Sequence, residues 1–321
     1  MTKNVSGTAL AAPFVRESSL AEALERRLSV EREFAEMGHS YRHGKLYRAF
    51  EHNVFRPVLK TGLELTGLYS RGLANALAPV VQDVALSFPN LPSGLNGFEI
   101  LQLSDFHVDE NPALADALLP FLAELRPDIC LFTGDYRFED QGSCEAVYPA
   151  MEKIVSAIRA RYGIFGILGN HDAAEIAIRL EEMGIHMLVN ESVEIGDGPN
   201  SLWLAGVDDP FDYRCADLPR ALAGVPRDAF QVLLCHAPEL YDEAERAGID
   251  LYLSGHTHAG QIRLPLVGAL RKNADCPREY AFGHWRHGNL QGYTSAGVGC
   301  SSLPVRFGCP PEIVRIELVR G

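Results

Sequence analysis

Residues 251–261 read LYLSGHTHAGQ, an apolar run that ends in two histidines separated by one residue. In an extended segment, residues two apart point to the same side, so His256 and His258 can converge on one point. Two neutral imidazoles that converge in this way are suitable ligands for a transition metal. A polar loop that contains two histidines by chance is the alternative, because short motifs have many false matches. The rest of the chain decides between the two.

Four other apolar runs also end in residues that can bind a metal or transfer a proton. The runs are FEILQLS at 98–104, DICLFTG at 128–134, IFGILG at 164–169 and QVLLC at 231–235. The residues that follow them are Asp105, His107, Asp135, Asn170, His171, Asp172 and His236. Coincidence is a poor explanation for five such endings in one chain.

The order of apolar runs and helix-like segments predicts an α/β fold from about residue 82 onward. Short apolar runs typical of strands alternate with amphipathic segments at 112–125, 144–160, 173–183 and 238–247. In open α/β sheets, the functional crevice lies at the carboxyl ends of the strands. We therefore expect the residues that follow the five runs to share one site.

Seven of these side chains offer oxygen and nitrogen ligands and no thiolate, namely Asp105, His107, Asp135, Asn170, His236, His256 and His258. They are too many for one tetrahedral zinc ion, and they suit two divalent ions such as Mn²⁺, Fe²⁺ or Zn²⁺. Two ions in one site need a shared anionic ligand, which a carboxylate can provide. Such a pair, about 3.5–4 Å apart, can activate a hydroxide and stabilise both oxygens of an in-line phosphoryl displacement.

Five motifs in this chain resemble those of the calcineurin-like metallophosphoesterases, namely D-x-H, G-D, G-N-H-[DE], a lone H and G-H-x-H. They occur here in that order as Asp105-Phe106-His107, Gly134-Asp135, Gly169-Asn170-His171-Asp172, His236 and Gly255-His256-Thr257-His258. The resemblance covers about residues 82–319 and is closest to the small bacterial phosphodiesterase-like branch, through GHTHAGQIRLP, LAGVDD and LPVRFGCPPEI. It implies a four-layer α/β/β/α sandwich at 82–321, with the site at one edge. The resemblance does not explain residues 1–81, which we expect to form an N-terminal helical extension.

The resemblance also implies two metal positions that share one carboxylate. One position would be held by Asp105, His107 and His258. The other would be held by Asn170, His236 and His256. Asp135 would bridge the two ions.

His171 is, by the same resemblance, the catalytic imidazole that contacts the phosphate or protonates the leaving oxygen. Asp172 is expected to orient it, because such an imidazole usually needs a hydrogen-bond acceptor for its other nitrogen. Asp208 and Asp209 either support the site or form a turn with a helix cap before Pro210. Both alternatives stay open.

Two arginines are candidates for substrate binding. Arg137 lies in YRFED, which follows Gly134-Asp135 where relatives usually have an aliphatic residue. It could contact the substrate phosphate or be a solvated loop arginine. Arg306 lies in the late family-like stretch. The remaining histidines are expected on the surface or in the core, and they are His39, His43, His52, His186, His284 and His287.

The composition limits the partners and the compartment. A net charge of -13 argues against general binding to nucleic-acid backbones, which needs a basic surface. Seven cysteines without a C-x-x-C pair do not suggest a disulfide framework. No apolar stretch is long enough to span a membrane, and TALAAPFV is short for the core of a signal peptide. We expect a cytoplasmic protein that can lie at the inner membrane surface.

The predicted function is metal-dependent hydrolysis of a phosphodiester, phosphomonoester or pyrophosphate bond by attack of a metal-activated hydroxide. A lipid-linked pyrophosphate hydrolase similar to UDP-2,3-diacylglucosamine pyrophosphatase, acting at the membrane surface, is one alternative. A metal-binding scaffold protein without activity is another, although none of the expected ligands is missing. The substrate and the oligomeric state stay open, because a fold does not determine them.

The extension at 1–81 is predicted to be helical. Ser19 and Glu22 have the spacing of a capping box, and Gly38 can end the helix that follows. A second helical stretch begins near Tyr41, and Pro57 marks a break or a new start. From 42 to 71 there are six Lys or Arg residues and two Glu, interleaved with aromatic and aliphatic residues. Such a segment can bind an anionic membrane at 41–81, or it can pack on the sandwich or form a dimer interface.

Overall fold

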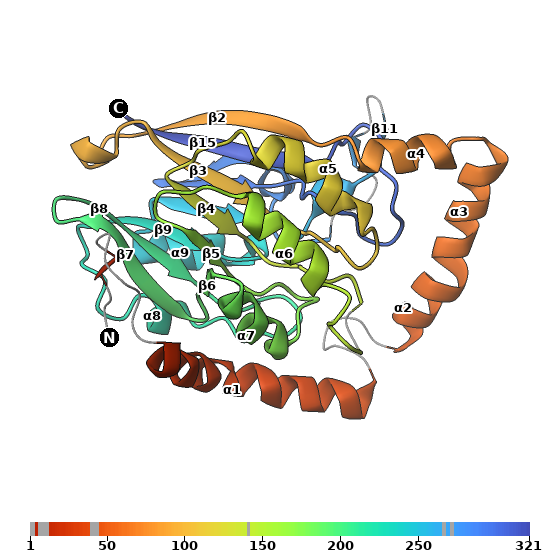
Figure 1. The fold of residues 1–321 in the computed structure, drawn as a ribbon, viewed down its shortest axis with the longest axis horizontal. Helices are drawn as coiled ribbons and strands as arrows, with labels where there is room; N and C mark the ends of the chain where they lie inside the picture. Colours follow the sequence, from red (N-terminus) through yellow and green to blue (C-terminus); the bar gives the residue numbers. More distant parts are fainter. Residues whose placement is uncertain (1–3, 6–12, 39–44, 140–141, 265–267, 270–272) are drawn as a thin grey trace.

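Two β-sheets packed face to face form the centre of the molecule (Figure 1). The computed structural model describes residues 4–5, 13–38, 45–139, 142–264, 268–269 and 273–321. In the described residues, one sheet has the order β2-β15-β3-β4-β5-β6. Its strands are Val80–Phe88 (β2), Glu312–Arg320 (β15), Phe98–Leu103 (β3), Ile129–Phe132 (β4), Ile164–Gly166 (β5) and Ile185–Met187 (β6).

The second sheet has the order β1-β7-β8-β9-β10-β14-β13. Its strands are Asn4–Val5 (β1), Glu191–Asp197 (β7), Asn200–Gly206 (β8), Phe230–Leu234 (β9), Leu251–Ser254 (β10), Leu290–Thr294 (β14) and Gly283–His287 (β13). A short separate ribbon joins Arg263–Leu264 (β11) to Gly268–Ala269 (β12). In the first sheet β3, β4 and β5 are parallel to one another, and in the second β9 is parallel to β10.

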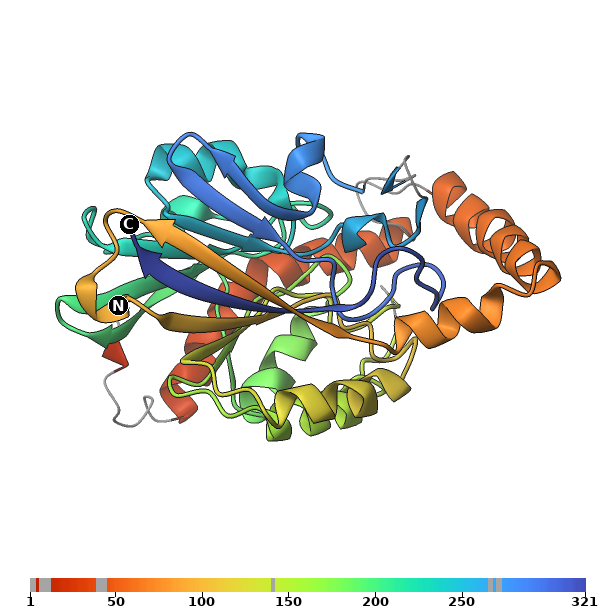
Figure 2. The ribbon, with the colours of Figure 1, turned by 90° about the horizontal axis from the view of Figure 1, so that it is seen from above.

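Helices cover the outer face of each sheet (Figure 2). On the first sheet they are Ala113–Leu122 (α5), Tyr148–Ala157 (α6) and Ala174–Glu182 (α7). On the second sheet they are Leu218–Ala221 (α8) and Tyr241–Ala247 (α9). The positions of α5, α6, α7 and α9 agree with the amphipathic segments predicted from the sequence, whereas α8 was not predicted.

Three hydrophobic layers hold the sheets and helices together. The middle layer lies between the sheets and includes Ile100, Phe165, Leu251 and Leu253. Tyr252 faces the other way, into the layer under α8 and α9, because neighbouring residues of a strand point to opposite faces. The four-layer α/β/β/α sandwich predicted from the sequence is therefore confirmed. The apolar runs read as continuous because the central strands are buried on both faces.

The first helix of the extension, Pro13–Met37 (α1), lies along the sandwich beside α7 (Figure 1). Its Leu20 and Leu24 are buried in the same layer as α5, α6 and α7. It begins at Pro13 and not at the predicted cap, Ser19. It ends at Met37, and the next residue, Gly38, has a left-handed φ of 74°, as predicted for a glycine that ends a helix.

The helices that follow α1 form an arm along one side of the molecule (Figure 1). We define the arm as residues 45–76. It contains Lys45–Phe50 (α2), a π-helical turn at Glu51–Phe55, Arg56–Leu65 (α3) and Tyr69–Ala76 (α4). Pro57 stands in the first turn of α3, as a new helix start allows. The predicted start near Tyr41, His39 and His43 lie outside the described residues. Among the described residues, no helix has both the length and the apolar character needed to cross a bilayer.

Candidate metal centre

The predicted ligands meet at one edge of the sandwich, where strands of both sheets end. Asp105 and His107 follow β3, Asp135 follows β4 and Asn170 follows β5, all in the first sheet. From the second sheet, His236 follows β9, and His256 and His258 follow β10. The site therefore has ligands from both sheets, at the carboxyl ends of parallel strands.

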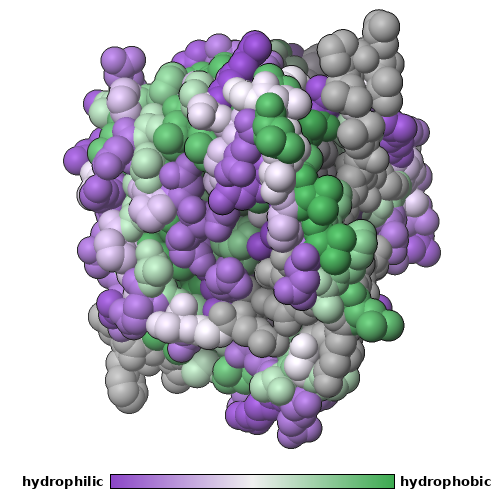
Figure 3. All heavy atoms as spheres, turned by 90° about the vertical axis from the view of Figure 1, so that its right-hand side faces the viewer, coloured by the Kyte–Doolittle hydropathy of each residue, from purple (hydrophilic) through white to green (hydrophobic). Residues whose placement is uncertain are grey.

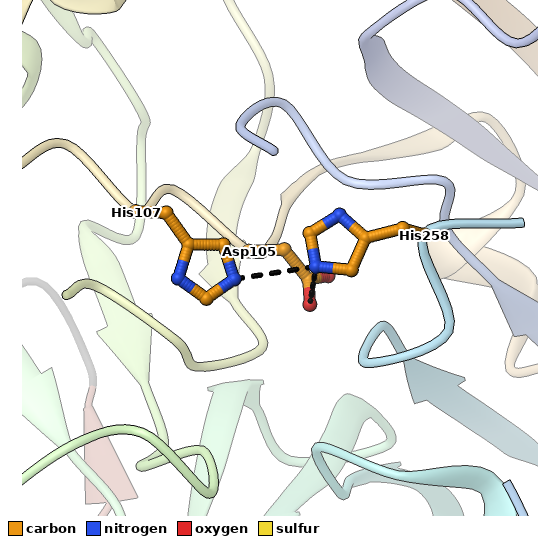
Figure 4. Close-up of side chains that lie close together, drawn as sticks. All are labelled: Asp105, His107 and His258. Carbon is orange, nitrogen blue, oxygen red and sulfur yellow. Dashed lines mark hydrogen bonds and ion pairs between the residues drawn. The ribbon is translucent and has the colours of Figure 1, made fainter. Parts of the chain in front are cut away.

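Asp105, His107 and His258 form the first of two ligand groups (Figure 4). All three are buried, and one ligand atom from each lies within 4.8 Å of the others. The Nε2 atoms of the two histidines are 3.2 Å apart, and Nε2 of His258 is 3.4 Å from Oδ1 of Asp105. Three nitrogen and oxygen atoms thus converge on one point.

The second group is Asp135, His236 and His256, also buried and within 4.8 Å. Asn170 completes it, because its Oδ1 lies 3.1 Å from Nε2 of His236 and 2.8 Å from Nδ1 of His256. The structure therefore brings together the seven side chains that the sequence nominated as ligands.

The carboxylate of Asp135 lies between the two groups. Its Oδ1 accepts the backbone N–H of His171 at 2.9 Å. Its Oδ2 lies 3.2 Å from Nε2 of His236 in one group and 3.6 Å from Nε2 of His107 in the other. One oxygen of this carboxylate thus lies near a predicted ligand nitrogen of each group.

The hydrogen bonds behind the ligands fix which atoms face the centre. Nδ1–H of His107 donates to the carbonyl of Arg137 at 2.7 Å, and Nδ1–H of His236 donates to that of Thr133 at 2.6 Å. A carbonyl can only accept, so the Nε2 atom of each ring keeps its lone pair for a metal. Nδ2 of Asn170 donates to Oδ2 of Asp212 at 3.1 Å, which turns its Oδ1 toward the site.

Burial controls the charge of these histidines. It lowers the pKa of His107 to about 4 and that of His256 to about 3, and it holds the pKa of His258 well below its usual range. These rings are therefore neutral at pH 7 and able to bind a metal. Burial also acts to lower the pKa of His236, but the carboxylate of Asp135 raises it to about 10. That carboxylate attracts any cation, so a divalent ion would compete with this proton.

Five of the predicted ligands have a left-handed backbone. The φ angles are 54° at Asp105, 44° at His107, 58° at Asp135, 68° at His256 and 50° at His258. Residues other than glycine adopt this conformation at an energetic cost, and such residues cluster at functional sites. The local backbone is thus arranged for the geometry of the side chains.

Two glycines of the motifs allow the loops to approach closely. A Cβ at Gly169 would clash with the carboxylate of Asp135, and one at Gly255 would clash with Ser104 and with the carboxylate of Asp105. The glycine in each motif is thus needed for space beside a predicted ligand.

His171 lies at the rim of the centre and is partly exposed. Its ring is 5.1 Å from that of His107, and its Nδ1 lies 2.6 Å from the carbonyl of Phe138. The expectation that Asp172 orients this ring is wrong, because the hydrogen-bond acceptor for Nδ1 of His171 is the carbonyl of Phe138. The buried carboxylate of Asp172 instead accepts backbone N–H groups of Gly169, Asp135, Tyr136 and Arg137. Asp172 therefore joins the loops that carry Asp135 and Asn170.

The structure also corrects the two substrate-binding candidates. Arg137 is buried, and its guanidinium donates to the carbonyls of His171, at 2.5 Å, and Gly142, at 3.2 Å. Arg306 is fully buried and donates to the carbonyls of Ala296, Gly297, Gly299, Cys309 and Pro310. Both guanidinium groups thus hold loop backbone together, a role that differs from the predicted substrate contact. Arg306 also lies 3.4 Å from Nδ1 of His258.

The pair Asp208 and Asp209 divides between the two alternatives. Asp209 accepts hydrogen bonds from the backbone N–H groups of Phe211, Asp212 and Tyr213, so it forms the turn that was one of the two alternatives. Asp208 pairs with a buried arginine of α1, described next. The side chain that supports a ligand directly is Asp212, through Asn170, and the sequence analysis missed it.

Arg27 of α1 is a second residue that the sequence analysis missed. Its side chain is completely buried under the loop at 169–172. Its Nη2 donates to the carbonyls of Gly169, at 2.6 Å, and Asp172, at 2.5 Å, while Nη1 pairs with Asp208. The guanidinium also lies 3.7 Å from the centroid of the Tyr213 ring. A residue of the extension thus holds both ends of the loop that carries Asn170 and His171.

We expect Arg27→Lys to weaken both the fold and the metal centre. Lysine keeps the charge beside Asp208 but cannot reach both carbonyls, and a buried carbonyl left unpaired costs roughly 1–3 kcal/mol. Mutation of a residue that supports a metal ligand typically lowers metal affinity by about 10–100-fold. Thermal unfolding and metal titration of the folded protein measure the two effects.

Arg26→Lys is the matched control for this prediction. Arg26 is the exposed neighbour on the same helix and donates to the carbonyl of Arg214. The Arg26→Lys substitution should leave metal affinity unchanged. Equal metal affinities of the Arg27→Lys, Arg26→Lys and unmodified proteins would show that Arg27 does not position the loop.

The calcineurin-like phosphoesterase family profile matches residues 98–260, which include the ends of all five strands and every predicted ligand. The chain belongs to this family. It is accordingly an enzyme of the class that hydrolyses phosphoric esters.

Three similar proteins extend the match beyond the profile. The uncharacterized metallophosphoesterase YkuE of Bacillus subtilis is 30% identical over 71% of this chain and 81% of its own length. The phosphodiesterase YaeI of Escherichia coli is 32% identical over 69% of this chain and 82% of its own. An uncharacterized metallophosphoesterase of Helicobacter pylori is 31% identical over 81% of this chain and 70% of its own.

Proposed function

We propose that the protein hydrolyses phosphodiester bonds with two divalent ions as cofactors. The observation that carries the two-ion centre is the position of Asp135 Oδ2 between the two ligand groups. The mixed oxygen and nitrogen ligands favour Mn²⁺, Fe²⁺ or Zn²⁺. The phosphodiesterase among the similar proteins supports a diester as the substrate.

The residues of this chain have distinct tasks in that reaction. Ions held by the two groups would supply a water of lowered pKa and neutralise charge on the phosphoryl oxygens. Asp135 screens the repulsion between the two positions. The neutral imidazoles of His107, His256 and His258 and the amide oxygen of Asn170 give ligation without excess negative charge, so an anionic phosphate can still approach.

His171 acts on the leaving group. Because Nδ1 is engaged by the carbonyl of Phe138, Nε2 is the ring atom that transfers a proton. Its place at the partly exposed rim, beside His107, allows it to reach an ester oxygen of a phosphate at the centre. General acid catalysis by such a group stabilises departure of an alkoxide.

Metal removal tests the proposed centre. Purified protein should contain about two divalent ions per chain, and dialysis against a chelator should abolish hydrolysis of bis(p-nitrophenyl) phosphate. Addition of Mn²⁺, Fe²⁺ or Zn²⁺ should restore it. Parallel assays with a monoester, a nucleotide and a lipid-linked pyrophosphate rank the other substrate classes.

His256→Ala and His284→Ala form a matched pair for the same experiment. His256 belongs to the second ligand group, whereas His284 lies on β13 and contacts Gln291. Only the first change should lower metal content. Activity that resists chelation in metal-free protein would contradict the assignment, and bound metal without hydrolysis of any substrate class would favour a scaffold.

A further inference from the structure

The arm presents a row of uncovered apolar side chains. Leu46, Phe50, Val54 and Val58 recur every four residues, so they lie along one side of the helix. Their exposed fractions are 88%, 54%, 46% and 67%, and Leu65 at the end of α3 is 84% exposed. No residue of α3 is buried. Single exposed apolar residues are common on proteins, but a continuous row indicates a binding surface.

The charge of the arm is opposite to that of the chain. The arm contains five basic residues and two acidic ones, whereas the whole protein carries -13. Lys60 is half-exposed and pairs with Glu64 at 3.9 Å. Figure 3 views this side of the molecule, where hydrophobic surface lies beside strongly hydrophilic surface. Apolar side chains flanked by basic ones are the composition that binds an anionic lipid surface.

One end of the arm is fixed to the rim of the metal centre. Oγ of Ser302 donates to Oε1 of Glu51 at 2.7 Å. The guanidinium of Arg56 lies 4.8 Å from the centroid of the Phe138 ring. Phe138 in turn packs against the ring of His107 at 5.8 Å, and its carbonyl engages His171. Arg56 at the start of α3 is therefore linked through Phe138 to the predicted catalytic imidazole.

The other end of the arm is fixed behind the first ligand group. The backbone N–H of Arg306 donates to the carbonyl of Gly72 at 3.1 Å, and Nδ2 of Asn75 donates to the carbonyl of Arg306 at 2.9 Å. The guanidinium of the same Arg306 lies beside His258. Because both ends are attached to loops of the site, the arm has a defined position relative to the metal centre.

We propose that the arm docks the enzyme on an anionic lipid bilayer, and that the substrate is an amphiphile with its phosphoester at headgroup level. The substrate class rests on the proposed phosphodiesterase function, whereas the docking does not. A second copy of the chain fits the arm less well than a lipid bilayer does. A two-fold contact would place one basic arm against another, and lipid phosphates complement that charge.

Vesicle flotation of the full-length protein tests the docking. Unmodified protein should float with vesicles of phosphatidylglycerol and phosphatidylcholine at low salt, and not with phosphatidylcholine alone. Val58→Glu should lower the bound fraction at least tenfold. Ile178→Glu is the matched control, because Ile178 is also an exposed aliphatic residue, on α7 outside the arm. Its binding should equal that of the unmodified protein.

Two further measurements separate docking from catalysis. Val58→Glu should hydrolyse soluble bis(p-nitrophenyl) phosphate at the unmodified rate but lose at least tenfold with a phosphodiester lipid presented in anionic vesicles. If neither the unmodified protein nor the variants hydrolyse the soluble diester, but the unmodified protein still floats with anionic vesicles, the phosphodiesterase function is refuted and the docking is still supported. Unmodified protein that stays unbound to anionic vesicles, equal flotation of Val58→Glu, or a dimer that Val58→Glu dissociates would each overturn the docking.

Discussion

Asp135→Asn is expected to remove the metal ions and to lower turnover by about 10³-fold. A unit charge about 4 Å from a cation contributes roughly 4 kcal/mol at the effective dielectric of a protein site, which corresponds to this factor. The geometry adds to the effect. The N–H of His171 needs an acceptor at Oδ1, so the new amide would place its NH₂ group where Oδ2 now lies between the two ligand groups.

Elemental analysis and steady-state kinetics measure this loss. Asp250→Asn is the matched control, because Asp250 accepts hydrogen bonds from Asn90 and Gln231 just before β10, at the end of the strand opposite the ligands. It should keep the full metal content. If Asp135→Asn retains both ions and a near-normal rate, Asp135 does not bridge them.

His171→Ala is expected to keep the metal ions and to lower kcat by about 10²–10⁴-fold. The contact of residue 171 with Asp135 is made by the backbone N–H, which alanine retains. The side chain removed is the imidazole at the rim. Metal content should therefore match that of the unmodified protein while the proton donor is lost.

A series of diesters with leaving groups of different pKa separates proton transfer from binding. A good leaving group needs no proton, so the loss caused by His171→Ala should shrink as the leaving-group pKa falls. An equal loss for every leaving group would assign His171 to phosphate positioning. Loss of metal in this variant would instead make it a structural or ligating residue.

The sandwich and its site were predictable because local patterns encode them. Each ligand closely follows an apolar run. The carboxyl ends of neighbouring parallel strands lie at the same edge of a sheet, so the order of the runs predicts that the ligands lie close together. The strands β6, β7 and β13 were missed, as were the two-residue strands β1, β11 and β12. Their pattern is weaker, and His186 and His284 interrupt the apolar character of two of them.

The residues that brace the site were not predictable in the same way. Arg27 contacts Asp208 across 181 positions of sequence, and its burial depends on carbonyls that only the folded loops bring together. Arg137 and Arg306 were assigned to substrate for a related reason. A sequence shows that an arginine is near a motif but not whether its guanidinium faces solvent or backbone. Asp212 likewise gains its role only through the fold.

The position of the centre between the two sheets has a consequence for how the protein is assembled. Each ligand group takes side chains from both sheets, and Asp105 contacts the backbone of His256 across 151 residues. Neither ligand group is assembled until the sheets have docked, so metal binding at the proposed centre would follow that step of folding. Once bound, each ion is a cross-link between the sheets, and a ligand at 100 times its Kd stabilises the native state by about 2.7 kcal/mol. Under the proposed function, metal supply would therefore change the stability of the folded enzyme as well as its turnover.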